Sequence, residues 1–96
     1  MDENVSIREL HARVYGVVQG VFFRHHAAAE AHRLGISGSV ENLADGSVRV
    51  RAQGSQEALD VFLTWLGRGP ELAVVDRVDA SWTAPDELLT GFRIVR

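Results

Sequence analysis

A loop bracketed by glycines and followed by an arginine is the part of this sequence best suited to chemistry. It reads Gly16-Val17-Val18-Gln19-Gly20-Val21-Phe22-Phe23-Arg24. Glycine lets the backbone turn sharply and puts no side chain between the backbone and a ligand. Arg24 falls in or near the first turn of the helix predicted to follow. Backbone N–H groups at a helix N-terminus, together with a guanidinium, favour a phosphate-like anion.

Single residues of this kind also have ordinary structural explanations. Arg24 could be a surface arginine, although a cation is mildly disfavoured at a helix N-terminus. Asn42 precedes Asp45-Gly46, and asparagine is common before tight turns. Gln19 could brace the loop, and Asp45-Gly46 is interpreted as turn chemistry.

Three histidines raise a metal hypothesis that their spacing does not favour. His25 and His32 share a helix face but lie about 10 Å apart along the axis, at a rise of about 1.5 Å per residue. His25 and His26 point in different directions. Because no carboxylate lies one turn away in a metal-binding pattern, we predict no metal site.

Hydrophobic periodicity predicts the elements that must position the loop. Alternating residues predict strands, and spacings of three and four predict helices. We expect Gly35 to end the first helix, Ser55 to cap the second, and the segment 67–70 to break it. The predicted elements are a strand over 7–15, a helix over 23–34, strands over 36–41 and 48–53, a helix over 55–66, a strand over 74–82 and a short strand over 92–95.

The order β-α-β-β-α-β with a short β tail predicts an α+β fold of the ferredoxin-like type. Strands with one polar face imply an antiparallel sheet that is exposed to solvent on one face, with two helices covering the other face. We expect residues 1–6 to form a flexible tail and residues 7–96 to form a single domain.

Composition limits the classes of function. The chain has 96 residues, a formal net charge of −3 and no cysteine. A net negative chain argues against a general nucleic-acid binder, and the lack of cysteine excludes a disulfide framework and a thiolate nucleophile. The N-terminus does not read as a signal peptide, and no apolar run approaches the length that a membrane span needs. We therefore expect a cytoplasmic protein without membrane or nucleic-acid partners, and a monomer.

Two segments resemble the signatures of the acylphosphatases. The first is Gly16-x-Val18-Gln19-Gly20-Val21-x-Phe23-Arg24, and the second is Gly38-x-Val40-x-Asn42-x-x-Asp45-Gly46-x-Val48. With further matches, the resemblance covers roughly residues 7 to 95. It implies a stand-alone enzyme that hydrolyses acyl phosphates to a carboxylate and inorganic phosphate, with no metal or organic cofactor.

The resemblance also implies roles for individual residues. Arg24 would hold the phosphate group, and Asn42 would orient the attacking water. Backbone N–H groups would surround the phosphate oxygens, and they come from Gln19, Gly20, Val21, Phe22, Phe23 and Arg24. The chemistry agrees, because a carboxylate leaves readily without a strong general acid, and fixed donors can stabilise charge on the phosphoryl oxygens.

Some positions depart from the family pattern. Val17 and Glu41 stand where basic residues are common, and Ser39 stands where a bulky aromatic is frequent. Loss of positive charge, with Glu41 beside Asn42, could weaken attraction for an anionic substrate.

Other functions stay open from the sequence. One is a non-catalytic module on the same fold that binds a phosphorylated ligand, since a fold does not define a function. Another is a detached domain of a larger enzyme, such as the acylphosphatase-like segment of a hydrogenase-maturation carbamoyltransferase. A third is an RNA-binding module, which the charge and the lack of aromatic-rich strand motifs disfavour.

Overall fold

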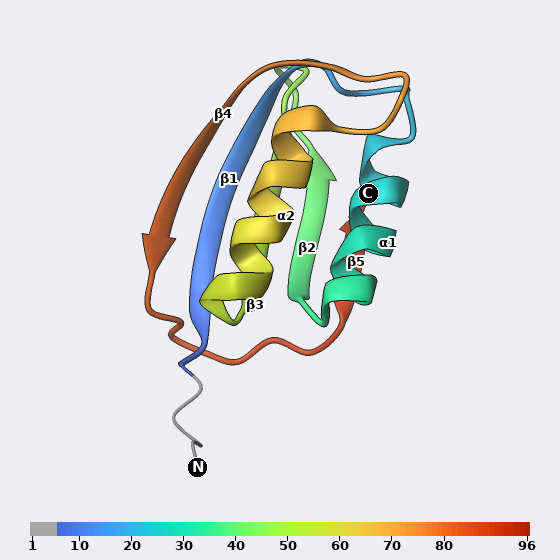
Figure 1. Cartoon of the computed structure of the whole chain (residues 1–96). Coiled ribbons are helices and arrows are strands. Elements are labelled where there is room, and N and C mark those ends of the chain that lie inside the picture. Colours follow the sequence, from blue (N-terminus) through green and yellow to red (C-terminus); the bar gives the residue numbers. More distant parts are fainter. Residues whose placement is uncertain (1–5) are drawn as a thin grey trace.

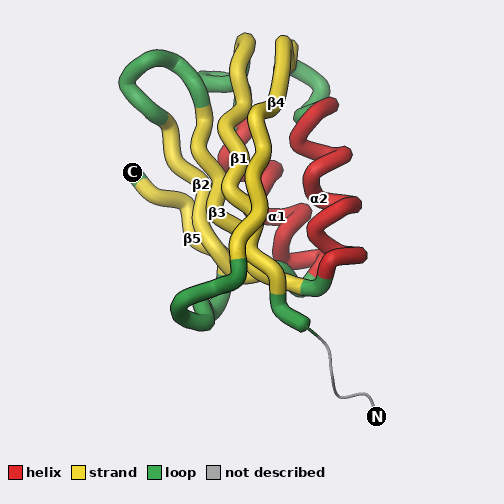
Figure 2. The backbone as a smooth tube through the Cα atoms, turned by 90° about the vertical axis from the view of Figure 1, so that its left-hand side faces the viewer, coloured by secondary structure: helices red, strands yellow, loops and turns green. Residues whose placement is uncertain are grey.

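Two helices lie side by side on one face of a five-stranded sheet (Figures 1 and 2). The computed structural model describes residues 6–96. Most of the tail predicted over residues 1–6 therefore lies outside the described residues. The elements in chain order are β1 (Arg8–Val17), α1 (Phe23–Leu34), β2 (Ser37–Asn42), β3 (Val48–Gly54), α2 (Gln56–Arg68), β4 (Val74–Thr83) and β5 (Phe92–Val95).

The strand order β4-β1-β3-β2-β5 is that of a ferredoxin-like sheet with one strand added at the edge. β1, β2, β3 and β4 pair antiparallel, as predicted. The prediction of an antiparallel sheet is wrong for β5, which runs parallel to β2. The loop after β4 crosses one end of the sheet to the far edge (Figure 1). Because β5 starts at the end of the sheet where β4 stops, β5 must run in the opposite direction to β4. Since β2 also runs opposite to β4, β5 is parallel to β2.

Alternation along the strands places the apolar side chains under the helices. In β1, for example, Leu10 and Val14 are fully buried. The helices contribute the spaced residues that the periodicity predicts, including Phe23 and Phe62. Burial of this apolar surface is the main force that holds the two layers together.

The helix ends follow the predicted signals. The Ser55 hydroxyl accepts a hydrogen bond from the Ala58 N–H at 3.1 Å and caps α2. Gly35 ends α1 with a φ of 71°. The segment 67–70 ends α2 as predicted, although the helix continues through Gly67 to Arg68 and has its C-cap at Gly69. A single glycine in a helix is tolerated, and Gly69 with its positive φ makes the actual stop.

Candidate active site

The loop between β1 and α1 has a strained conformation at the point where it enters the helix. Gly20 has a φ of 76°, which suits glycine. Phe22 has a φ of 62°, and it is the one non-glycine residue with a positive φ among residues 6–96. A left-handed conformation costs an ordinary residue about 1–2 kcal/mol. Such strain is concentrated at functional sites, where the surrounding structure enforces it.

The N-terminus of α1 lacks the usual side-chain cap. Phe22 occupies the cap position and makes no side-chain hydrogen bond, and the first turn contains no acidic residue. The N–H groups of a first helical turn have no partner within the helix. An anion near Phe23 and Arg24 would satisfy these donors and would be favoured by the helix dipole.

The Arg24 side chain is held from the opposite end of the chain. Its Nη1 donates to the backbone carbonyl of Val95 in β5 at 2.9 Å. The guanidinium is thereby fixed while its other N–H groups stay available to a ligand. Because a guanidinium donates in a planar fork, a fixed orientation suits the recognition of two phosphate oxygens at once.

Asn42 is the last residue of β2 and lies in the same pocket as Arg24. Its Oδ1 is buried and accepts no hydrogen bond from the residues that the structure describes. A buried acceptor without a partner costs free energy of about 1–3 kcal/mol. This atom therefore points to a missing hydrogen-bond donor, such as a water molecule or a substrate hydroxyl.

The pocket has a volume of about 470 Å³ and brings together residues from three regions of the chain. Four of the predicted phosphate-loop residues line it, and no Asp or Glu side chain of residues 6–96 does. Gln19 and Val21 do not line it: Gln19 turns its side chain to the neighbouring hairpin, and Val21 packs against the core. The lining residues are Gly20, Phe22, Phe23, Arg24, His25, Asn42, Ile94 and Arg96.

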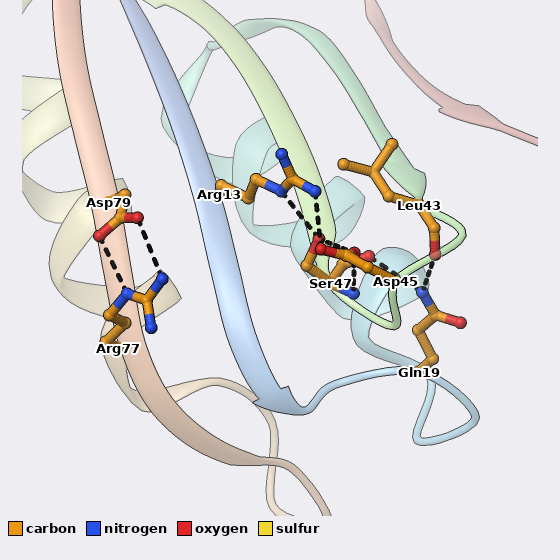
Figure 3. Close-up of polar contacts among 7 residues, drawn as sticks. All are labelled: Arg13, Gln19, Leu43, Asp45, Ser47, Arg77 and Asp79. Atoms are coloured by element: carbon orange, nitrogen blue, oxygen red, sulfur yellow. Dashed lines mark hydrogen bonds and ion pairs between the residues drawn. The ribbon is translucent and has the colours of Figure 1, made fainter.

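Gln19 ties the loop to the hairpin that follows Asn42. Its Nε2 donates to the carbonyl of Leu43 at 2.8 Å and to the carbonyl of Ser47 at 2.9 Å, as Figure 3 shows. The bracing role considered for Gln19 is thereby confirmed, and its target is the β2–β3 turn. The loop that carries Arg24 and the strand that carries Asn42 are thus held in a fixed relation.

A second set of contacts stiffens the same turn. Asp45 accepts from the backbone N–H of Ser47 at 2.9 Å, and Arg13 on β1 donates to Asp45 at 2.7 Å (Figure 3). The Ser47 hydroxyl and N–H, and then Arg13, hold the pKa of the Asp45 carboxyl below its usual value. Asp45-Gly46 does form a turn, and the sequence did not indicate that Asp45 also pairs with β1.

Glu41 has little direct influence on the pocket. Residues 41 and 42 face opposite sides of the sheet, because side chains alternate along a strand. Glu41 accepts a hydrogen bond from Arg49 at 2.6 Å and lines a separate hollow on the open sheet face. The weakening of anion binding expected from Glu41 is therefore offset by a paired cation.

The hollow on the open sheet face is larger, at about 670 Å³, but its two arginines are already paired. Arg49 pairs with Glu41, and Arg51 donates to the buried Glu9 at 2.8 Å. Arginines that are already paired with carboxylates bind an added anion less well than an arginine with free N–H groups. The pocket with Arg24 and Asn42 is therefore the better candidate for chemistry.

Three residues of the pocket were not among those predicted from the sequence. Ile94 and Arg96 come from the C-terminal end, and His25 follows Arg24 on α1. No motif marks the last residues of the chain, and their place depends on the pairing of β5 with β2. His25 was considered as a metal ligand, but within residues 6–96 no three His, Asp or Glu side chains gather as a metal site would require.

Fold and pocket together define a class: an α+β sandwich with a pocket beside the loop that leads into its first helix. A family model described as Acylphosphatase matches residues 10–94 of the chain. The chain belongs to the acylphosphatase family, and it is a hydrolase that acts on acyl phosphates.

Individual relatives agree with this assignment. An acylphosphatase of Thermococcus kodakarensis is 45% identical over 85 residues, which are 88% of this chain and 92% of that protein. The crystal structure of an acylphosphatase from Bacillus subtilis superposes with a TM-score of 0.90 at 30% identity, covering 93% of this chain and 99% of that one. T. kodakarensis HypF contains a similar fold, with a TM-score of 0.81 and 29% identity, over 92% of this chain but 12% of its own.

Proposed function

We propose that this enzyme cleaves acyl phosphates by direct attack of a water molecule held by Asn42 on a phosphate group held by Arg24. The observation that carries the proposal is the buried, unpartnered Asn42 Oδ1 in the pocket that Arg24 also lines. This oxygen accepts a hydrogen bond from the water and orients its lone pair toward phosphorus. A neutral amide does not take the proton, and it adds no negative charge beside an anionic substrate.

The phosphate group is bound by the loop. The backbone N–H groups of Gly20, Phe22, Phe23 and Arg24, which line the pocket, and the free side-chain N–H groups of Arg24 donate to its oxygens. As charge shifts during the displacement, these fixed donors stabilise the transition state without reorganising. The uncapped start of α1 adds its own N–H groups to the same anion.

The reaction needs no general acid. The water oxygen forms a bond to phosphorus as the bond between phosphorus and the acyl oxygen breaks. The electron pair of the broken bond leaves on the carboxylate, and the water protons pass to the phosphate product and solvent. A carboxylate is a good leaving group at neutral pH, which is why the pocket functions with Arg24 and Asn42 and without a paired acid and base.

Hydrolysis of benzoyl phosphate in the presence of a chelator tests this mechanism. We expect Asn42→Ala to lose nearly all turnover while inorganic phosphate still inhibits what remains. Arg24→Gln should lose about 100- to 1000-fold in kcat, the effect typical of removing one preorganised donor, and should also lose phosphate inhibition. If Asn42→Ala turns over at the wild-type rate, Asn42 does not orient the water.

We also propose that the enzyme acts as a cytoplasmic monomer on small-molecule acyl phosphates. No helix within residues 6–96 is long and apolar enough to span a membrane. The edge strand β4 carries the exposed, charged residues Asp76, Arg77 and Asp79, and charges on an edge discourage pairing with another chain. Analytical ultracentrifugation at micromolar concentration should show a single species of one chain.

A further inference from the structure

A second hollow lies next to the pocket. It has a volume of about 370 Å³ and lies between α1 and β5, which Figure 1 shows next to each other. His25 and Ile94 line both the pocket and this hollow, so the two are adjacent. We call this hollow the side groove, and its lining residues are His25, Ala28, Ala29, His32, Phe92 and Ile94.

The lining of the side groove follows from the periodicity of its two elements. The α1 residues are spaced by three, four and seven, which places them on one helix face. Phe92 and Ile94 are two apart on β5 and share one face of the strand. No Asp, Glu, Lys or Arg side chain of residues 6–96 lines the side groove, so its walls are apolar apart from the two imidazoles.

We propose that the side groove holds the acyl group of the substrate, and that the enzyme therefore prefers acyl phosphates with a linear, apolar acyl chain. This inference rests on the proposed function. The water attacks from the side of Asn42, and the leaving oxygen lies on the opposite side of phosphorus in an in-line displacement. Phe92 and Ile94 pair with Gly38 and Val40 of β2, which ends at Asn42, so the side groove runs along β5 away from Asn42.

The dimensions of the side groove fit a chain of medium length. Its α1 wall runs from His25 to His32, about 10 Å at a rise of about 1.5 Å per residue. With C–C bonds of about 1.5 Å, this span accommodates about six to eight carbon atoms in extended form. An acetyl group would leave the side groove empty.

Substrate chain length is the first test. A fully buried methylene improves affinity about fourfold, and an open groove that covers about half of it should give about twofold per methylene. We therefore expect KM to be about 15-fold lower for hexanoyl phosphate, which has four more methylenes, than for acetyl phosphate. The kcat should be nearly equal, because the chain is bound alike in the ground state and the transition state. A KM that does not change along the series acetyl, butanoyl and hexanoyl phosphate overturns the side-groove proposal and leaves the hydrolase mechanism intact.

A substitution inside the side groove is the second test. Ala29→Phe, at an exposed position of α1, should fill the side groove and remove the difference between the KM values for hexanoyl and acetyl phosphate. His26→Phe is the matched control, because His26 is exposed on α1 and lines neither the pocket nor the side groove. If Ala29→Phe and His26→Phe change the ratio of the KM values for hexanoyl and acetyl phosphate equally, the proposal is wrong.

Binding without turnover separates the side groove from the catalytic mechanism. Calorimetry should show that hexylphosphonate binds about 30-fold more tightly than methylphosphonate to the wild type and to Asn42→Ala, but not to Ala29→Phe. If both phosphonates bind equally, the side groove does not hold the chain even where hydrolysis occurs. If the wild type instead dimerises in the ultracentrifuge and Ala29→Phe is monomeric, the side groove is an interface between copies, and the proposal is wrong.

Discussion

The guanidinium of Arg24 and the backbone carbonyl of Val95 are joined by a hydrogen bond of 2.9 Å, although 71 positions separate them in the chain. Val95 pairs with Glu41 in β2, next to Asn42. The strand that fixes Arg24 is therefore hydrogen-bonded to the strand that carries Asn42. β5, the shortest strand of the sheet, thus connects the residue proposed to bind phosphate with the residue proposed to orient the water.

Arg24→Lys should not rescue the site, although it keeps the positive charge. A lysine ammonium has no planar fork, so it cannot bond the Val95 carbonyl and present two parallel donors to phosphate. We expect kcat/KM for benzoyl phosphate to fall about 100-fold or more, with thermal unfolding little changed. Arg33→Lys, at an exposed arginine of α1 that pairs with Glu30, is the control and should keep full activity. A fully active Arg24→Lys would show that charge alone suffices.

Gln19→Glu should separate the loop from the hairpin. The variant replaces an N–H donor with a carboxylate that faces the carbonyls of Leu43 and Ser47. Loss of these hydrogen bonds should cost about 2–4 kcal/mol of unfolding free energy and reduce kcat about tenfold or more. Activity should partly recover as the pH falls, because a protonated carboxyl again donates one hydrogen bond.

The control for Gln19→Glu is Gln56→Glu, which makes the same change at an exposed glutamine of α2. Gln56 bonds to Asp60 far from the loop, so its variant should keep the wild-type pH profile of kcat. A Gln19→Glu enzyme that is destabilised but has unchanged kcat would limit Gln19 to a structural role.

The elements of the fold could be predicted because their signals are local. Leu10, Ala12 and Val14 alternate in the sequence, and all three are buried in the sheet. The Ser55 cap and the Gly35 stop depend on residues within one turn of the helix they delimit. The direction of β5 could not be predicted in this way, because it depends on which end of the sheet the preceding loop reaches.

The site was predictable where a motif is contiguous and unpredictable where it depends on packing. The motifs placed Arg24 and Asn42 at the ends of elements, and the structure brings both to one pocket. The contribution of Ile94 and the Arg24–Val95 hydrogen bond require the pairing of β2 with β5, which no local pattern encodes. The positive φ of Phe22 was also not foreseen, since an aromatic residue normally avoids that conformation.

The buried carboxylate of Glu9 should make stability depend on pH. Burial raises its pKa, but hydrogen bonds from Arg51 and Gln53, and the charges of Arg51 and His11, outweigh this effect and hold the pKa below its usual value. A lowered folded-state pKa stabilises the fold above the unfolded pKa of about 4.3, and this contribution is lost as the pH falls through the folded pKa.

Glu9→Gln should therefore lower the unfolding free energy by about 2 kcal/mol at pH 7, and the difference from wild type should shrink below about pH 4. Urea unfolding, monitored by tryptophan fluorescence, measures the unfolding free energy of both proteins at pH 7 and at pH 3.5. Glu71→Gln, at an exposed position after α2, is the control and should change stability little at either pH. An equal loss for Glu9→Gln at pH 7 and at pH 3.5 would mean that the charge of Glu9 is not what stabilises the fold.

Gly38→Ala should be the most damaging small substitution in the sheet. Gly38 has a φ of 149°, and an added Cβ would lie 1.9 Å from the carbonyl oxygen of Arg51 in β3. Its N–H also donates to the Gly91 carbonyl at 2.8 Å, so the backbone cannot shift without losing the loop that leads to β5. We expect a loss of about 3 kcal/mol or more of unfolding free energy.

The activity of Gly38→Ala should fall together with its stability, because β2 ends at Asn42 and pairs with the strand that holds Arg24. Gly67→Ala is the matched control: a Cβ there meets no atom within 4 Å, and the residue is helical. That variant should gain about 0.5–1 kcal/mol, since alanine favours helix over glycine. For Gly38→Ala, the unfolding free energy measured in urea and the rate of benzoyl phosphate hydrolysis should both decrease. A stable Gly38→Ala protein with low activity would instead show that β2 can shift in the sheet and carry Asn42 out of place.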